Sequence, residues 1–546
     1  MSLDPTAALP SRRPARTARP RGGAVPMGLA IAAGVVGAVA ILPLVYLIVR
    51  STDATSQTWD VILRPETLWL FARSLALTAA VTGACIAIGV PLAWLTTRTD
   101  LPARRIWATL FALPLAFPSY VFALSLQGAF GDRGLIASVL APFGVESIPT
   151  ISGFVGAFLA LTLLCFPYTY LVAAAGFRGL DPSFDEASRT LGQDRRATFR
   201  RVTLPLLRPS IAAGALLVAL YTLHDFGAVS LMRYETFTQA IFVQYRSAFD
   251  RTPAAILSLM LVAVAIVILA IEQRARGRAR YHRSGIGASR PPTPIALGRW
   301  RWPAIGASGL VVAVSLVAPI SVLAFWLNRG VRNDVAFDFT WSAAIGSLEL
   351  SILGAGIILA ASIPVAVLAA RYPGRLSALV ERAAHVGYAL PGLVVGLSFV
   401  FLSVRTLPGL YQSIALVLLA YLVLFLPQSS QPLTAAIQQV NPRFEEAART
   451  LGHGRVRAFG AVVLPRVAAP ALAGGALVFL TAMKELPATL LLRPTGFETL
   501  ATEIWAWTSA GRLSQAAAPA ILLIVMCAIP LYLVARRVQP DEVRAE

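Results

Sequence analysis

The sequence contains a single lysine, Lys484, among 47 basic residues. A P-loop needs the pattern Gly-x4-Gly-Lys-Ser/Thr, in which the lysine contacts the nucleotide phosphates. Lys484 stands in the segment Thr-Ala-Met-Lys-Glu-Leu-Pro, which has no glycine loop. The chain therefore cannot bind ATP by this route.

Charged residues and cysteines are also scarce. Only 14% of the 546 residues are charged, whereas 57% are hydrophobic. A soluble protein of this size needs far more polar surface, so the composition predicts a polytopic membrane protein. Cys85, Cys165 and Cys527 lie in apolar runs at unrelated spacings, so they indicate neither a disulfide framework nor a metal site. The sequence also shows no grouped histidines, cysteines and carboxylates, so we predict no catalytic residues and no bound cofactor.

The net charge of +20 comes almost entirely from arginine. A charge of this size is compatible with nucleic-acid binding. Here, however, the arginines lie in short segments next to apolar runs, which is the pattern of the positive-inside rule in membrane proteins. We therefore expect membrane lipid around the chain and no nucleic-acid partner.

Apolar runs long enough to cross a bilayer recur along the whole chain. We predict an all-α protein with about twelve transmembrane helices, each of roughly 20 residues or more. They cover about residues 27–49, 69–96, 106–128, 151–175, 209–231, 254–271, 303–327, 343–370, 379–404, 410–436, 468–491 and 515–535. With this number of spans, the arginine-rich segments all fall on one side of the membrane. That side is cytoplasmic by the positive-inside rule, so both termini are expected in the cytoplasm.

These spans predict a domain organisation with two halves of six spans each. The predicted parts are a cytoplasmic Arg/Pro-rich tail (1–26), a first half (27–271), a basic cytoplasmic linker (272–302), a second half (303–536) and a cytoplasmic tail (537–546). We interpret the first apolar run as a retained helix, because a cleaved signal peptide has a shorter apolar core.

The two halves repeat each other in sequence. Residues of the same type recur 273 positions apart, as in the pairs Ser74 and Ser347, Pro91 and Pro364, Arg98 and Arg371, and Pro118 and Pro391. Later matches are 260 positions apart, so the first half carries 13 extra residues between 126 and 182, mostly in an outer loop. Two halves of equal orientation form a parallel repeat about an axis along the membrane normal, which places a pathway between them. The paired prolines could kink the third and ninth spans, either to line a cavity or as tolerated packing kinks.

One polar segment occurs in both halves with little change. The first copy begins Asp-Pro-Ser-Phe-Asp-Glu-Ala-Ser-Arg-Thr-Leu-Gly at Asp181, and the second begins Asn-Pro-Arg-Phe-Glu-Glu-Ala-Ala-Arg-Thr-Leu-Gly at Asn441. The first residue of each is a good helix N-cap, the proline suits the first turn, and the glycine suits a left-handed C′ position. We predict a short helix, a glycine turn and a second short helix that stops before Pro205 and Pro465.

An ordinary amphipathic connector needs caps, but it does not need the same sequence in two diverged halves. A DNA-reading helix-turn-helix is disfavoured by the flanking spans. A docking surface for two like subunits explains the repetition best.

The repeated segment resembles the EAA loop of ABC-type importer permeases. The residues that match the motif are Glu186, Ala187 and Gly192 in the first copy and Glu446, Ala447 and Gly452 in the second, while Ser188 departs from it. The resemblance implies a type I ABC importer transmembrane domain whose short helices couple to an ATP-hydrolysing subunit. It also implies two copies of a separate ABC ATPase and a periplasmic or lipid-anchored substrate-binding protein. The chain would then be a transport subunit of the bacterial cytoplasmic (inner) membrane and no enzyme.

Ionisable residues within the fifth and eleventh spans are candidates for the pathway or its gate. These are His224 and Asp225 in the first half and Lys484 and Glu485 at the matching positions of the second. Ionisable side chains inside a membrane are functional candidates by default. Three interpretations stay open, namely an Asp225–Lys484 ion pair that locks the halves, contact with the substrate, or placement at the surface.

The segments that begin at Asp225 and at Lys484 resemble the ferric-iron branch of these permeases, in which both halves share one chain. This resemblance implies ferric iron as cargo. Thiamine, a polyamine or a phosphonate is the alternative cargo for the same machinery. An ion-coupled secondary transporter with internal symmetry is the alternative of a different class.

Overall fold

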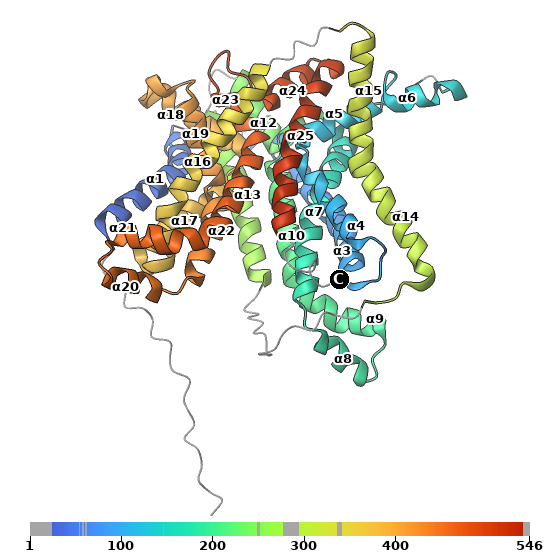
Figure 1. Ribbon diagram of the computed structural model, residues 1–546. Coiled ribbons are helices and arrows are strands. Elements are labelled where there is room, and N and C mark those ends of the chain that lie inside the picture. Colours follow the sequence, from blue (N-terminus) through green and yellow to red (C-terminus); the bar gives the residue numbers. More distant parts are fainter. Residues whose placement is uncertain are drawn as a thin grey trace, which may run out of the picture.

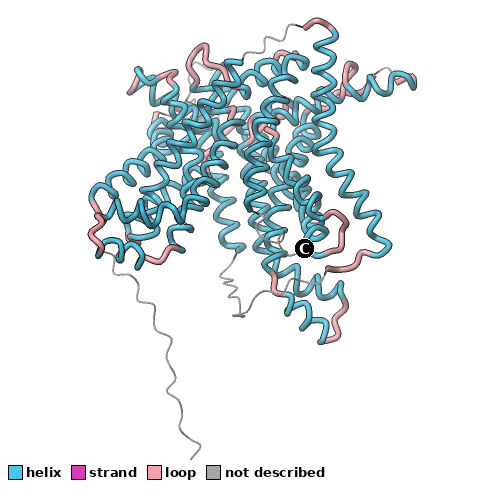
Figure 2. The backbone as a smooth tube through the Cα atoms, viewed as in Figure 1, coloured by secondary structure: helices cyan, strands magenta, loops and turns pink. Residues whose placement is uncertain are grey.

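The computed structural model describes residues 25–53, 55–56, 59–60, 63–145, 147–247, 252–276, 294–335 and 341–538. Most of the predicted N-terminal tail, of the basic linker and of the C-terminal tail lies outside these residues, so those predictions are not tested. The described part of the chain is helical and forms no strand beyond one isolated bridge between Thr99 and Ile295 (Figures 1 and 2).

Ten helices in the described residues are long and apolar enough to cross a membrane, and two bent helix pairs bring the number to twelve. The prediction of twelve spans is confirmed when each bent pair counts as one. The continuous spans are α1 (Met27–Ser51), α3 (Pro65–Arg98), α7 (Gly153–Gly179), α10 (Leu204–His224), α13 (Thr252–Arg276), α14 (Arg301–Val312) with η5 (Ala313–Val317) and α15 (Ala318–Arg332), α16 (Trp341–Arg371), α19 (Ile414–Gln439), α22 (Leu464–Met483) and α25 (Leu513–Val538).

The third and ninth spans are broken at their matched prolines. In the first half, α4 (Arg104–Ala112) and η1 (Leu113–Ala116) precede a bend of 94° before α5 (Ser119–Ala129). In the second half, α17 (Arg375–His385) and η6 (Val386–Tyr388) precede a bend of 109° before α18 (Gly392–Thr406). Pro118 and Pro391 have extended backbones and directly precede the new helices. A proline disfavours helical geometry in the residue before it, so the predicted kinks are full breaks.

The predicted bounds of the fifth and eleventh spans were wrong at both ends. At the start, α9 (Arg195–Thr198) and α21 (Arg455–Ala458) do not stop before the prolines, but run through π-helical turns η3 (Phe199–Thr203) and η8 (Phe459–Val463) into α10 and α22. A π turn pairs residues five apart, as in the hydrogen bond from the Leu204 N–H to the Phe199 carbonyl. Pro205 and Pro465 are the second residues of α10 and α22. Proline has no backbone N–H, so it fits at a helical position where no hydrogen bond from that N–H is required. At the far end, the helices stop at His224 and Met483, and short helices α11 (Gly227–Leu231) and α23 (Pro487–Leu492) follow.

The first helix of each half also packs on the other half. Helix α1 packs mainly on α16 and α17 of the second half and also on α13 of its own half. Helix α15 packs on α25 of its own half and on α5 of the first, and α14 packs on α4 of the first. The Trp326 indole N–H of α15 donates to the Gly128 carbonyl at 2.8 Å. Any movement of one half is therefore transmitted directly to a helix of the other.

The matched serines of the second and eighth spans have the same structural role. The Ser74 hydroxyl accepts a hydrogen bond of 3.1 Å from the Phe237 N–H, the first residue of α12 (Phe237–Ser247). The Ser347 hydroxyl accepts one of 2.8 Å from the Leu500 N–H, the first residue of α24 (Leu500–Ser509). Because the first N–H groups of a helix lack partners within it, each serine stabilises the start of a buried helix.

We expect Gly387→Ala to destabilise the broken ninth span. A Cβ atom at Gly387 would lie 2.1 Å from the Val423 carbonyl oxygen of α19. Because backbone has to move to relieve this overlap, the free energy of unfolding should fall by about 1–3 kcal/mol. The midpoint of thermal unfolding in detergent, followed by tryptophan fluorescence, measures the effect. Gly356→Ala is the matched control, since a Cβ there has no atom within 4 Å; equal midpoints for both variants would contradict the prediction.

Candidate functional site

The repeated polar segment forms a helical hairpin in each half. Helix α8 (Pro182–Thr190) and helix α20 (Arg443–Thr450) are each followed by a glycine turn and the second short helix. The Asp181 carboxylate accepts the Ser183 N–H at 3.0 Å, and the Asn441 side-chain oxygen accepts the Arg443 N–H at 3.0 Å. The predicted short helix and glycine turn are therefore confirmed in both copies, and Asp181 is the N-cap of α8, whereas Pro442 takes this position in α20. The second helix does not stop before the proline in either copy.

The turns require glycine. Gly192 has φ +78° and Gly452 has φ +89°, in the left-handed region that side chains with a Cβ rarely adopt. Both hairpins lie at the same end of the molecule, where α8 and α20 extend beyond the spans (Figure 1). The repeated chemistry is thus presented twice on one face.

The side chains that match the coupling motif point outward. Glu186, Ala187, Glu446 and Ala447 are exposed, as are both turn glycines. Beside them, Leu191 is 80% exposed and Leu451 is 82% exposed. The same apolar side chain is thus exposed at the same position of both hairpins.

The inner side of each hairpin is held differently in the two halves. In the first, the hydroxyls of Ser188 and Thr198 form a hydrogen bond of 3.0 Å between the two short helices. In the second, Ala448 and Ala458 occupy these positions and are buried. Ser188, the departure from the motif, therefore faces its own hairpin and leaves the exposed surface unchanged.

An ion pair ties the second hairpin to the bundle. Arg371, the last residue of α16, lies 2.7 Å from the Glu445 carboxylate and donates to the Val440 carbonyl at 3.0 Å. Both charged side chains are largely shielded from solvent, with 13% and 24% exposure. The repeat of Arg98 as Arg371 was visible in the sequence and was a signal for this anchor, although the acidic partner was not predicted.

We expect Arg371→Gln to loosen the second hairpin. The change leaves Glu445 partly buried without its partner, which costs about 1–3 kcal/mol locally. Protease cleavage within the hairpin should become several-fold faster, and the exchange Arg371→Glu with Glu445→Arg should restore much of the protection. Arg375→Gln, an exposed arginine of α17, is the control. Cleavage that is equally fast in wild type and in Arg371→Gln would refute the anchor.

The acidic pathway candidates lie at helix breaks and not within continuous spans. The Asp225 carboxylate accepts the backbone N–H groups of Ala228 at 2.9 Å and Val229 at 3.2 Å, at the start of α11. The Glu485 carboxylate accepts the Ala488 N–H at 3.0 Å, at the start of α23. Each acid thereby satisfies donors that the break leaves without helical partners.

Each acid-capped helix packs against the broken span of its own half. A Cβ at Gly227 would lie 3.0 Å from the Ser119 hydroxyl oxygen, and a Cβ at Gly392 would lie 2.6 Å from a Glu485 carboxylate oxygen. Ser119 and Gly392 are the first residues after Pro118 and Pro391 in the helices α5 and α18. The structure thus joins two features that were separate in the sequence, namely the proline breaks and the buried acids.

Lys484 connects the halves, but not through an ion pair with Asp225. Its ammonium group donates to the Leu115 carbonyl of η1 at 2.6 Å, and no salt bridge joins it to Asp225 in the described part of the chain. The predicted locking ion pair is therefore wrong, because the backbone carbonyl released at the break is the nearer partner. Placement at the surface is wrong as well for Asp225, which is buried. The halves also meet where the Phe226 and Trp505 rings lie with centroids 5.0 Å apart.

Comparison with known proteins identifies the family. The family described as "Binding-protein-dependent transport system inner membrane component" matches the chain twice, over residues 85–280 and 362–541. The chain belongs to this family. Each match covers the later part of one structural half, and each includes one hairpin and one broken span.

Similar permeases have different cargoes in their names. The Fe(3+)-transport system permease protein FbpB 2 of Haemophilus influenzae is 31% identical over 513 residues, which are 93% of this chain and 98% of the relative. The putative ferric transport system permease protein FbpB 1 of the same organism is 23% identical over 81% of this chain and 73% of its own length. The sulfate transport system permease protein CysT of Salmonella typhimurium is 30% identical over 81% of its length, but this covers 40% of this chain.

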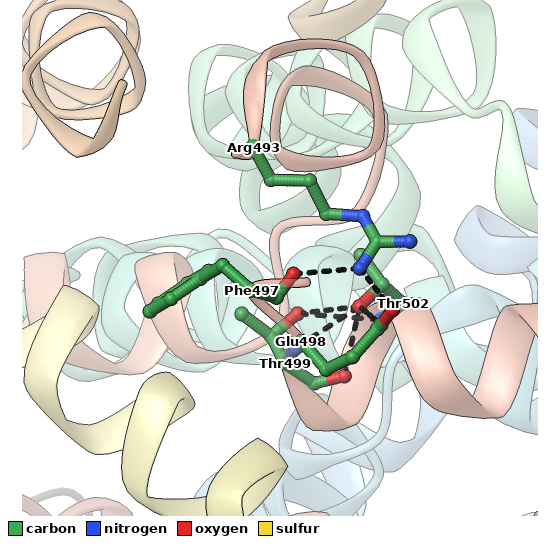
Figure 3. A network of polar contacts seen from close by, with 5 residues as sticks. All are labelled: Arg493, Phe497, Glu498, Thr499 and Thr502. Atoms are coloured by element: carbon green, nitrogen blue, oxygen red, sulfur yellow. Dashed lines mark hydrogen bonds and ion pairs between the residues drawn. The ribbon is translucent and has the colours of Figure 1, made fainter. Parts of the chain in front are cut away.

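Arg493 is the last residue of the segment from Lys484 that resembles ferric-iron permeases. Its side chain stabilises the loop between α23 and α24 of this permease. Its guanidinium donates to the Phe497 carbonyl at 2.6 Å and pairs with the Glu498 carboxylate (Figure 3). The Thr502 hydroxyl donates to the other Glu498 oxygen at 2.9 Å, and Thr499 and Thr502 cap α24 reciprocally. Within the described residues, the hydrogen bond and the ion pair of the Arg493 side chain are thus both to its own loop, which the sequence pattern alone did not reveal.

The His224 imidazole is the remaining polar candidate. It ends α10, and its Nε2 atom is buried without a hydrogen-bond partner in the described residues. A buried polar atom that lacks a hydrogen-bond partner lowers the stability of the fold. His224 therefore stays a candidate for contact with a transported substrate.

Proposed function

We propose that this chain is the transmembrane permease subunit of an ATP-driven ABC importer for ferric iron. The observation that carries the cargo is the similarity to a ferric permease over 93% of the chain and both halves. The sulfate relative covers only 40% of the chain, so it supports the general machinery more than its own cargo.

The presence of two like hairpins favours a partnership with two copies of a separate ABC ATPase at the cytoplasmic face. Glu186, Ala187 and Gly192, with Glu446, Ala447 and Gly452, would contact these subunits, and their exposure on one face fits a two-fold partner. A periplasmic or lipid-anchored binding protein would deliver the cargo at the opposite end. The chain itself binds no cofactor in this scheme, and ATP is used by the partner. Both termini are then cytoplasmic, in the inner membrane of a bacterium.

His224, Asp225, Lys484 and Glu485 would form the cargo gate between the halves. The support is geometric, since all four residues lie at the helix breaks, and Lys484 reaches across to the other half. ATP-driven closure of the ATPases would move the hairpins and the attached α10 and α22. These helices end at the breaks, so the movement would arrive where the gate is.

Reconstitution into liposomes with the ATPase and the binding protein tests this function. We expect ATP-dependent accumulation of radioactive iron from a ferric-loaded binding protein, and none of sulfate, molybdate or thiamine. Accumulation of another of these solutes would replace the cargo and leave the machinery in place. Concentrative uptake by this chain alone, driven by an ion gradient, would instead establish a secondary transporter.

A further inference from the structure

A groove outside the coupling and gate regions lies between α6 (Leu135–Leu140) and α15. It has a volume of about 720 Å³, which is within the usual range of roughly 300–1,000 Å³ for ligand sites. It lies at the end of the bundle opposite the hairpins, where α6 projects sideways beside α15 (Figure 1). Its lining residues are Ser138, Ser321, Ala324, Phe325, Asn328, Arg329, Arg332 and Asn333.

The charge of the groove is positive. Arg329 and Arg332 both line it, and no acidic side chain among the described residues does. Arg329 is held in place, since its guanidinium donates to the Arg133 carbonyl at 3.0 Å and lies 5.3 Å from the Trp326 ring centroid. Arg332 forms no hydrogen bond or ion pair with any residue in the described ranges and is exposed. One fixed and one available guanidinium suit a phosphate group.

The helix face that leads away from the groove becomes apolar. Asn328, Ala324 and Ser321 of α15, which line the groove, are followed by Val317 of η5, and all four are exposed at intervals of three or four residues, so they share one face of this continuous helix. Further down, Val314 and Leu310 are exposed as well. From Ser321 to Leu310 the helix rises about 16 Å, which matches one leaflet of a hydrocarbon core of about 30 Å.

The helix α6 belongs to the extra segment that the second half lacks. Val139 of α6 and Phe143 of η2 (Ala141–Phe143) are 59% and 80% exposed. Trp341, which begins the next span after α15, is also exposed at this end of the bundle. Exposed tryptophans are enriched at the boundary between hydrocarbon and headgroups. The groove is therefore at headgroup level, with apolar side chains beside and below it.

We propose that the groove between α6 and α15 binds the phosphate headgroup of an anionic phospholipid, with an acyl chain along the apolar face of α14 and α15. Along the helix, the polar lining with its two arginines is followed by the apolar strip. In a phospholipid, the phosphate headgroup is followed by the acyl chains in the same order. A soluble anion would use only the upper part of this arrangement. An acidic protein surface would leave the apolar strip unused.

Native mass spectrometry of the full chain in detergent, titrated with phosphatidylglycerol, tests the proposal. We expect one preferred lipid per chain, about ten-fold weaker binding in Arg332→Gln because one charge-assisted contact is lost, and unchanged binding in Arg405→Gln. Arg405 is the control because it is an exposed arginine in the last turn of α18, outside the groove. It pairs with Asp53 at 3.6 Å. Diacylglycerol, which lacks the phosphate, should not bind at this position.

Three results would overturn the proposal. Equal retention of phosphatidylglycerol by wild type and Arg332→Gln would remove the headgroup contact. Displacement of the lipid by millimolar inorganic phosphate would show a site for a free anion. Crosslinking of Ser138→Cys to the substrate-binding protein, without competition by phosphatidylglycerol, would assign the groove to protein docking. Normal elution of Arg332→Gln in size-exclusion chromatography shows that the variant is folded.

Discussion

Changing Glu186 and Glu446 together to arginine should abolish transport. Both side chains are exposed on the hairpins, at matching positions beside Leu191 and Leu451. If they enter a partner surface that accepts carboxylates, two arginines place like charges opposite each other, which costs several kcal/mol per site. ATP-dependent uptake should fall by at least about 100-fold, since each 1.4 kcal/mol is a factor of ten in affinity. Co-purification of the ATPase on a tagged permease should be lost as well.

The variants of this experiment separate docking from folding. Glu381→Arg is the matched control, because Glu381 is an exposed glutamate of α17 outside both hairpins. It should retain uptake and the ATPase. Glu186→Arg and Glu446→Arg as single changes should each reduce uptake strongly, since closure of a symmetric pair needs both contacts. Normal uptake and normal ATPase recovery in the double variant would disprove the role of the hairpins.

Replacement of Asp225 by Asn and Glu485 by Gln should impair transport without unfolding the protein. An amide oxygen can still accept the N–H groups of Ala228, Val229 and Ala488, and Asn and Asp are similarly good caps. The negative charge, however, is lost from two sites at helix breaks. At an effective dielectric constant of about 20, a unit charge 4 Å from a carboxylate is stabilised by about 4 kcal/mol. We therefore expect iron uptake to fall by at least about ten-fold in the double variant.

The alanine variants give the structural comparison. Asp225→Ala and Glu485→Ala lose the cap as well as the charge, so each should lower the free energy of unfolding by about 1 kcal/mol. The amide variants should unfold like wild type. If the amide variants transported iron at the normal rate, the carboxylates would be caps only, and the gate would have to be sought among other residues.

Local features of this protein followed well from the sequence. The caps Asp181 and Asn441 and the left-handed Gly192 and Gly452 were predictable because each depends on a few adjacent residues. The number of spans was predictable too, since length and hydropathy decide whether a helix can cross a membrane. The ends of the fifth and eleventh spans were not, because apolar residues continue on both sides of the breaks at Asp225 and Glu485.

Contacts between distant residues needed the structure. Lys484 and Leu115 are 369 positions apart, and Arg371 ends the span α16 whereas Glu445 lies on the hairpin helix α20. Opposite charges at matched depths suggested an ion pair of Lys484 with Asp225. The structure instead provides a backbone carbonyl at a proline break, which pattern alone does not reveal.

The sequence by itself determined a twelve-span membrane protein in two like halves, each with a polar helical hairpin, because composition, periodicity and repetition act over short distances. Only the tertiary structure decided that the buried acids cap short helices, that Lys484 reaches across the halves, and that α6 and α15 form a basic groove. These depend on which helix breaks meet in space. That is decided by the packing of all spans together.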